Sequence, residues 1–204
     1  MLKIAALIAN LSIVFCEVYA LGHIRRKSDV LKYYTYLQNF LALIASLIFS
    51  FCSIVCLITG KPIPELAKGL RYMAASGLAA TAFIFIAFLG AGKKIALTED
   101  DFLPGLKPRS ANILLHYVCP ALALASFILL ERDVRITHDF WTGIVALPSC
   151  IYWILYIILS AAKLWEEPYN FSSGKGKTGI LDVLTVVLIP LSFIAISFVL
   201  WNIM

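Results

Sequence analysis

Residues 33–59 read YYTYLQNFLALIASLIFSFCSIVCLIT and include no charged side chain. A helix that crosses the hydrocarbon core of a bilayer needs about 20 predominantly apolar residues. This stretch is longer, so it predicts a membrane-spanning helix with room to tilt. The rest of the chain agrees, because 61% of its 204 residues are hydrophobic and only 14% are charged. Soluble domains are about half apolar and about a quarter charged, so the composition indicates an integral membrane protein.

Apolar segments of similar length recur along the chain, at residues 2–21, 33–59, 70–89, 111–130, 140–162 and 180–203. The connections between them are too short for a soluble domain. We therefore predict an all-α fold in which residues 1–204 form one polytopic bundle of six transmembrane helices. The first segment is longer than the apolar region of a typical signal peptide, so we expect a retained helix.

The 17 lysines and arginines are divided unevenly between the two faces of such a bundle. The positive-inside rule places the richer face, formed by the first, third and fifth connections, in the cytoplasm and both termini outside. We interpret the net charge of +5 as this topology signal and expect no nucleic-acid partner. A bacterial cytoplasmic membrane and an endoplasmic reticulum membrane both fit. The richer face carries Arg25, Arg26, Lys27, Lys32, Lys93, Lys94, Lys107, Arg109, Lys163, Lys175 and Lys177, and the poorer face Lys3, Lys61, Lys68, Arg71, Arg132 and Arg135.

The cysteines and histidines give no sign of a metal centre or a cofactor. All five cysteines fall inside the apolar segments, where they are expected to be small core residues and not partners in disulfides. Cys52 and Cys56 share a helix face, but no histidine is placed to complete a metal site with them. The three histidines are not arranged to hold a haem.

Polar side chains inside the spans gather near one face of the predicted bundle. Counted at about 1.5 Å per residue from the nearest loop cation, they lie about 4–12 Å from the face of the odd connections. Because polar groups are costly in the membrane, this layer predicts a shallow pocket in that leaflet. We expect no comparable set in the other leaflet. The residues of the predicted pocket are Glu17, Thr35, Asn39, His116 and Asp182.

Each of these residues also has an ordinary structural explanation. A membrane threonine commonly bonds to a carbonyl of its own helix. A lone histidine is often a satisfied structural group, and Glu17 could be neutral or paired with Arg25 or Arg26. Asp182 lies in the first turn of its helix, where a carboxylate suits the helix dipole. The convergence of several such residues on one layer favours a functional pocket.

Three short segments resemble the androgen-induced / androgen-dependent tissue-factor-pathway-regulating family of six-span membrane proteins. The segment Tyr34-Thr35-Tyr36-Leu37-Gln38-Asn39 is similar to that family's threonine segment at the start of helix two. The segment Leu115-His116-Tyr117-Val118-Cys119-Pro120 is similar to its histidine segment, and Pro168-Tyr169-Asn170-Phe171 resembles the aromatic-proline stretch between the last two helices. The similarity is closer to bacterial relatives of unknown substrate.

This resemblance implies hydrolysis of lipid esters, notably fatty acid esters of hydroxy fatty acids, with Thr35 and His116 at the catalytic positions. In the mechanism that we expect, His116 takes the proton of Thr35 and later protonates the leaving alkoxide. Asn39 is one helical turn from Thr35 and could bind the oxyanion or the substrate. Glu17 or Asp182 could orient the imidazole, with Glu17 favoured because a carboxylate at that depth needs a partner. The substrate would come from the bilayer, and the sequence gives no oligomeric state.

Two other classes of function remain open. The first is a non-enzymatic protein, either a small transporter or a lipid-binding regulatory protein, whose polar layer is a ligand site. The second is a structural bundle in which polar side chains hold the helices together. The first predicts altered binding or flux without a covalent intermediate, and the second predicts only a loss of stability.

Overall fold

The computed structural model describes residues 2–24, 33–87, 107–131, 136, 140–162, 164 and 180–203. This part of the chain is helical and contains no β-strand. Its helices are α1 (Leu2–Gly22), α3 (Tyr34–Thr59), α4 (Glu65–Ala87), α5 (Pro108–Ile113), α6 (Cys119–Ala125), α7 (Trp141–Ile144), α8 (Leu147–Ala161) and α9 (Ile180–Ile203). The π-helical turns η2 (Leu114–Val118) and η3 (Ser126–Leu130) flank α6.

The helix lengths and composition confirm an all-α polytopic membrane bundle. Within the described residues, five helices are long and apolar enough to cross a membrane, and the stretch Val187–Ile203 of α9 is a shorter apolar helix. Most helix bounds lie close to the predicted spans. The main difference is α4, which begins at Glu65 instead of at residue 70.

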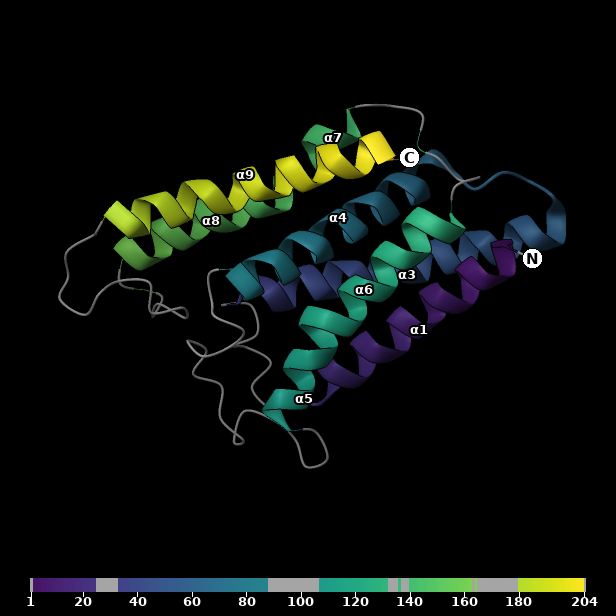
Figure 1. The fold of residues 1–204 in the computed structure, drawn as a ribbon, viewed down its shortest axis with the longest axis horizontal. Helices are drawn as coiled ribbons and strands as arrows, with labels where there is room; N and C mark the ends of the chain where they lie inside the picture. The colour runs from purple at the N-terminus through teal and green to yellow at the C-terminus, as the bar shows by residue number, and fades with distance from the viewer. Residues whose placement is uncertain are drawn as a thin grey trace.

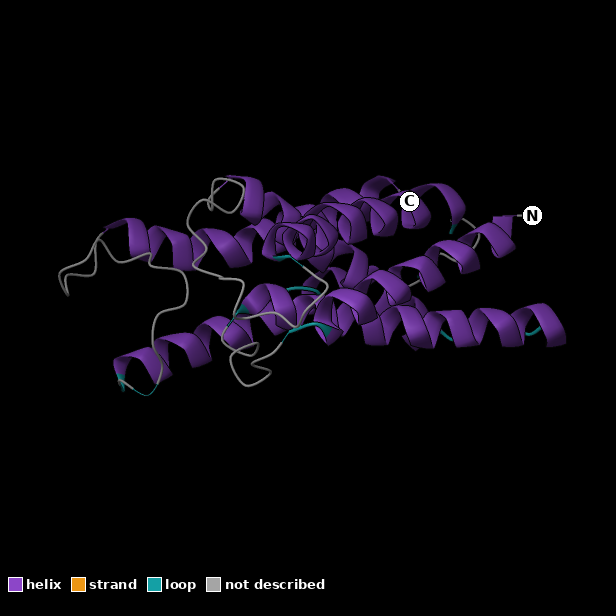
Figure 2. Cartoon of the chain, turned by 90° about the horizontal axis from the view of Figure 1, so that it is seen from below, coloured by secondary structure: helices purple, strands orange, loops and turns teal. Residues whose placement is uncertain are grey.

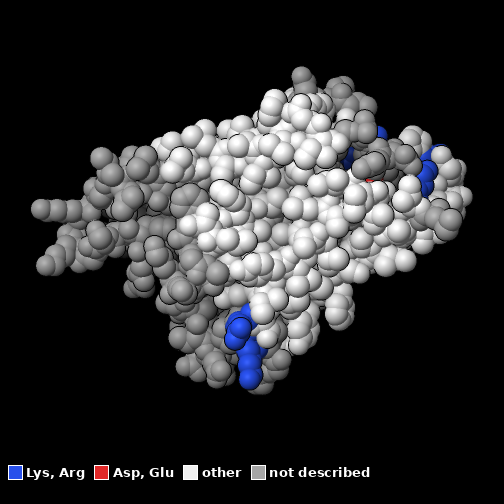
Figure 3. Space-filling model, viewed as in Figure 1, with Lys and Arg blue, Asp and Glu red and all other residues white. Residues whose placement is uncertain are grey.

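The distribution of polar and apolar side chains is the reverse of that in a soluble protein. Phe15 and Ile58 are 71% and 80% exposed, whereas Glu17 and Asn39 are completely buried. Exposed apolar surface on this scale suits contact with lipid. On the face drawn in Figure 3, the described lysines and arginines lie at the right-hand end and at the lower edge, and the broad middle is uncharged.

Helix α4 is the centre of the bundle. It contacts α3 and α6 on one side and α7 and α9 on the other, and Figure 1 shows α8 and α9 running side by side beyond it. Small residues along α4, among them Gly69, Ala74 and Gly77, let these neighbours approach closely. A four-helix unit of α1, α3, α4 and the α5–η3 segment therefore shares α4 with the second layer of α7, α8 and α9.

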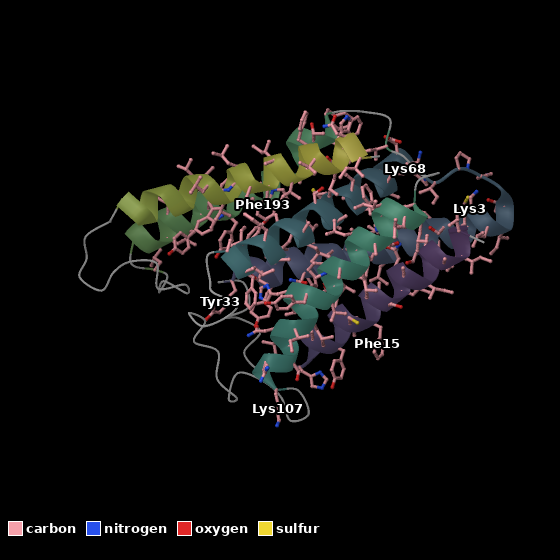
Figure 4. The ribbon with its side chains drawn as sticks, viewed as in Figure 1. Lys3, Phe15, Tyr33, Lys68, Lys107 and Phe193 are labelled. Carbon is pink, nitrogen blue, oxygen red and sulfur yellow. The ribbon has the colours of Figure 1, made fainter. Side chains whose placement is uncertain are left out.

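Both chain ends lie at the same end of the bundle (Figures 1 and 2). We call this end the N face: α1 and α4 begin there, and α3 ends there. We call the opposite end, where α1 ends and α3 begins, the Thr35 face. Figure 4 shows Lys3 and Lys68 at the N face, with Tyr33 and Lys107 toward the other end.

Candidate functional site

Four of the five residues predicted to form the pocket, Glu17, Thr35, Asn39 and His116, lie on helices of the four-helix unit, whereas Asp182 lies in α9 of the second layer. The segment of η2 and α6 contacts both α1 and α4 and lies between them (Figure 1). From α3, Tyr36 packs in one cluster with Leu115 of η2. Gln38 lies against α4 so closely that a Cβ at Gly77 would come within 1.7 Å of the Gln38 amide nitrogen.

These two contacts fix the direction in which the start of α3 presents its other side chains. Successive residues of an α-helix are about 100° apart around the axis, so Thr35 and Asn39 point between the directions of Tyr36 and Gln38. Tyr36 is directed to α1 and η2, and Gln38 to α4. Thr35 and Asn39 therefore point toward the segment of η2 and α6.

Thr35 and Asn39 are coupled to each other one helical turn apart. The Asn39 side chain is completely buried, and its Nδ2 donates a hydrogen bond to the Thr35 carbonyl oxygen at 2.7 Å. Its Oδ1 has no partner among the described residues. Since an amide nitrogen carries two hydrogens, one remains available for a ligand. The Thr35 side chain is half-buried, so its hydroxyl can meet a substrate.

Farther along α3, the same face continues as a polar stripe. Ser46 and Ser50 are buried, and neither hydroxyl has a partner in the described part of the chain. Ser53 follows one turn later, and its hydroxyl donates to the Phe49 carbonyl at 2.7 Å. The side of α3 that carries Thr35 and Asn39 therefore has polar side chains along most of its length.

His116 is a buried imidazole in the π-helical turn η2. It is 3% exposed, its ring stacks on Phe85 with centroids 3.7 Å apart and planes at 14°, and its Nδ1 has no partner among the described residues. Pro120, four residues on, has no N–H for the His116 carbonyl, and its ring crowds that carbonyl. This accounts for the wider turn, which the bond from the Cys119 N–H to the Leu114 carbonyl closes. Such turns often occur at functional sites.

Glu17 of α1 lies against α6. The side chain is completely buried, and neither carboxyl oxygen has a hydrogen bond of good geometry within the described part. The Cys119 thiol, three residues after His116, is its close neighbour. A carboxyl group in this position needs a proton, a water molecule or a ligand.

The structure brings these segments together in one four-helix unit without joining their reactive groups. Within the described ranges, no hydrogen bond links His116 to Thr35 or to Glu17. The orienting role of Glu17 therefore stays a prediction. Asp182 lies in α9, but its side chain, like Arg25 and Arg26, is outside the described residues.

A second buried polar cluster lies toward the N face, where we expected none. Arg71 Nη2 and Glu131 Oε1 are 3.1 Å apart, with the two side chains 1% and 2% exposed. Asn10 Nδ2 donates to the same Glu131 oxygen at 2.8 Å, and Ser126 Oγ donates to it at 2.5 Å. Arg71 also donates to the Ala123 carbonyl at 3.1 Å. The expectation that only one leaflet holds a polar set was wrong.

Arg71 and Glu131 were missed because each lies near the end of an apolar segment and was counted as a loop residue. The sequence did contain a signal for this pair. Arg71 stands within an apolar run, and Arg71 and Glu131 carry opposite charges at the same end of the third and fourth spans. Arg71 is therefore a buried, paired side chain and not a solvated loop cation.

All five cysteines are free thiols, and Cys119 is buried while the other four are partly buried. Within the described ranges, no three His, Cys, Asp or Glu side chains are grouped so that they could hold a metal ion.

No protein-family model, curated protein or solved structure matches this chain. The resemblance in the threonine and histidine segments therefore rests on those short motifs and on the arrangement of the spans.

Proposed function

We propose that the protein is an integral-membrane lipid ester hydrolase in which Thr35 is the nucleophile and His116 the general base. The observation that carries this proposal is the buried imidazole of His116, whose Nδ1 has no partner among the described residues, in the segment toward which Thr35 points. A buried ring nitrogen without a partner is costly unless it serves a ligand or a reaction. The half-buried Thr35 hydroxyl supplies the group that a base would activate.

The proposed reaction has two steps. In the first, a ring nitrogen of His116 takes the Thr35 proton while the hydroxyl oxygen attacks the ester carbonyl; the imidazolium then protonates the departing alkoxide. In the second, His116 takes a proton from water, hydroxide attacks the acyl-threonine, and Thr35 regains its proton as the fatty acid leaves. In ligand-free sites catalytic hydrogen bonds are commonly long or absent, and they tighten when substrate binds.

Two neighbours are assigned supporting roles. Asn39 holds the Thr35 backbone through its 2.7 Å bond, and its second amide hydrogen is free to donate to the tetrahedral oxyanion. Glu17 is proposed to position His116; its carboxyl oxygens have no hydrogen bond of good geometry among the described residues, and the Cys119 thiol is their close neighbour. Asp182 remains a second candidate for this positioning role.

The substrate is proposed to enter from the lipid. Thr35 is the second residue of α3, so its hydroxyl lies close to the level of the lipid ester groups. The acyl chains can stay in the bilayer beside the exposed apolar side chains while water reaches the ester from the Thr35 face. We infer that this face is cytoplasmic, because the lysines and arginines of the odd connections lie on it.

The proposal is tested by labelling the purified protein in mild detergent with a fluorophosphonate probe. We expect wild type to be labelled, Thr35→Ala to lose the label, and Thr35→Ser to keep it, because serine retains the hydroxyl. His116→Gln should reduce the labelling rate by about 100-fold or more, the usual contribution of a general base.

Two matched variants control for damage to the fold. Thr59→Ala removes an exposed hydroxyl at the far end of α3, and His23→Gln removes a histidine whose Nδ1 lies 2.6 Å from the Tyr19 carbonyl oxygen. Both should be labelled like wild type. Equal labelling of Thr35→Ala and wild type would reject Thr35 as the nucleophile.

One observation favours a second function, ligand binding or transport. Glu17, Ser46 and Ser50 are buried with polar atoms that lack partners in the described part, and they lie on two helices of the same unit. Such unpaired polar groups suit water or a small polar ligand. This alternative predicts saturable binding that Thr35→Ala weakens only slightly, and no covalent adduct with the probe.

A further inference from the structure

A cavity of about 270 Å³ opens at the N face, at the other end of the bundle from Thr35. It lies where α1 begins, α3 ends and α4 begins, with the end of η3 closing one side. Small-molecule sites have volumes of about 300–1,000 Å³. The cavity is therefore large enough for a headgroup and the start of a chain, but not for a whole lipid.

Two cations line this cavity. Lys3 comes from the first turn of α1 and Lys68 from the first turn of α4, and Figure 4 shows both at the same end of the molecule. Lys68 Nζ lies 3.5 Å from Glu65 Oε2, and an ammonium with three hydrogens can hold that carboxylate and a second anion together. The polar side of the cavity is therefore suited to an anion.

The other walls are apolar. Phe49 and Ile63 are buried in one cluster, with Cys56 packed against it, and Leu130 completes the lining. Ser53 also lines the cavity, but its hydroxyl is already bonded to the Phe49 carbonyl. These walls suit methylene groups, as the lysines suit an anion.

The buried ion-pair cluster holds this part of the bundle in place. Asn10 donates to the Ala6 carbonyl at 2.9 Å and to Glu131 at 2.8 Å, and Ala6 itself lines the cavity. Arg71 ties α4 to the same carboxylate. Helices α1, α4 and η3 are thus fixed to one another directly beside the cavity.

We propose that this cavity binds one anionic amphiphile, with its carboxylate or phosphate at Lys3 and Lys68 and its first methylenes against Phe49, Ile63 and Leu130. The position fits, because helix ends lie at the level of the lipid headgroups, where lysine side chains reach the interface. The site is independent of the proposed hydrolysis, since it lies at the opposite membrane face and shares no residue with the Thr35 site.

The test is native mass spectrometry of the full chain in mild detergent, with palmitate, phosphatidylglycerol, methyl palmitate and inorganic phosphate as separate probes. We expect one molecule of palmitate or of phosphatidylglycerol to bind. Palmitate alone would identify a free fatty acid as the ligand, and phosphatidylglycerol alone a membrane lipid. Methyl palmitate, which has no charge, should bind at least about tenfold more weakly than palmitate, as expected when charge-assisted hydrogen bonds are lost.

Variants test the cations directly. Lys3→Gln combined with Lys68→Gln should weaken binding by about tenfold or more. Lys61→Gln removes an exposed cation of the connection between α3 and α4. Lys61 does not line the cavity, so this variant should bind the probes like wild type. Equal affinity for palmitate and methyl palmitate would overturn the proposal, and this comparison needs no variant. So would binding of inorganic phosphate as tight as that of palmitate, or unchanged binding in the double variant.

Discussion

Arg71 and Glu131 show, at the scale of single residues, what a buried charge requires of its surroundings. Arg71 is 1% exposed, and it is compensated by one carboxylate oxygen and the Ala123 carbonyl. Removing one partner of a buried ion pair leaves the other charge without compensation, and this costs more than losing the pair as a whole.

We predict that Arg71→Met lowers the free energy of unfolding by about 3–5 kcal/mol, because Glu131 is then buried without its cation. The double variant Arg71→Met with Glu131→Leu should be clearly more stable than this single variant. Thermal unfolding in mild detergent measures both. If the double variant lost as much as the two single variants together, the residues would not be coupled.

Glu17 presents the opposite situation, a buried acid without a hydrogen-bond partner in the described part. Glu17→Leu should raise the free energy of unfolding by about 1–3 kcal/mol, because it removes an unsatisfied polar group. It should also slow fluorophosphonate labelling if Glu17 positions His116. Glu65→Gln, which alters a partly exposed acid paired with Lys68, is the control and should change neither. A less stable Glu17→Leu protein with normal labelling would assign Glu17 a structural role.

How much the sequence could predict also differs between residues. Glu17, Asn39 and His116 were singled out as polar groups within apolar segments, and the structure buries all three. The sequence could not predict which neighbour each side chain meets, such as Phe85 against His116 or Cys119 beside Glu17. Those contacts depend on the rotation of each helix, which hydrophobicity defines poorly when a helix is apolar on every side.

At the scale of helices, close packing on glycine determines how the layers meet. A Cβ at Gly69 would lie 2.1 Å from the Trp141 ring, so α4 and α7 touch only because residue 69 has no side chain. Proline has a comparable influence on the fifth span: Pro148 stands in the first turn of α8, just after the break from α7. The apolar segments located these spans, but this break follows from the ring geometry of a single residue.

We predict that Gly69→Ala lowers the free energy of unfolding by about 1–3 kcal/mol, because a rigid indole ring has to move. Gly143→Ala is the matched control, since a Cβ there meets nothing within 4 Å. Thermal unfolding of both variants in the same detergent provides the comparison. Equal stability of the two would mean that the contact of α4 with Trp141 is looser than in this structure.

At the scale of the whole molecule, the bundle has buried polar side chains near the start of α3 and a cationic cavity at the N face. The composition and the six apolar segments were enough to predict the all-α membrane fold. The charge count predicts the orientation. The order of the helices around α4 could not be predicted from the sequence, because small residues mark a helix contact without indicating which helix is the neighbour.

We predict that both the C-terminus and the connection at Lys61 lie outside the cytoplasm. In a bacterial host, alkaline phosphatase fused at the C-terminus should be active, and a fluorescent protein fused there should be dark. A fluorescent C-terminal fusion would reverse the orientation and move Thr35 to the outer side of the membrane.

The most direct test of the proposed threonine mechanism is to map the acyl group that an activated fatty acyl ester leaves on the protein. After a rapid acid quench, peptide mass spectrometry should find the acyl mass on the peptide that contains Thr35. It should find no such mass in Thr35→Ala and a reduced amount in His116→Gln. Acylation of a different residue, or unchanged ester turnover in Thr35→Ala, would contradict the proposed threonine mechanism.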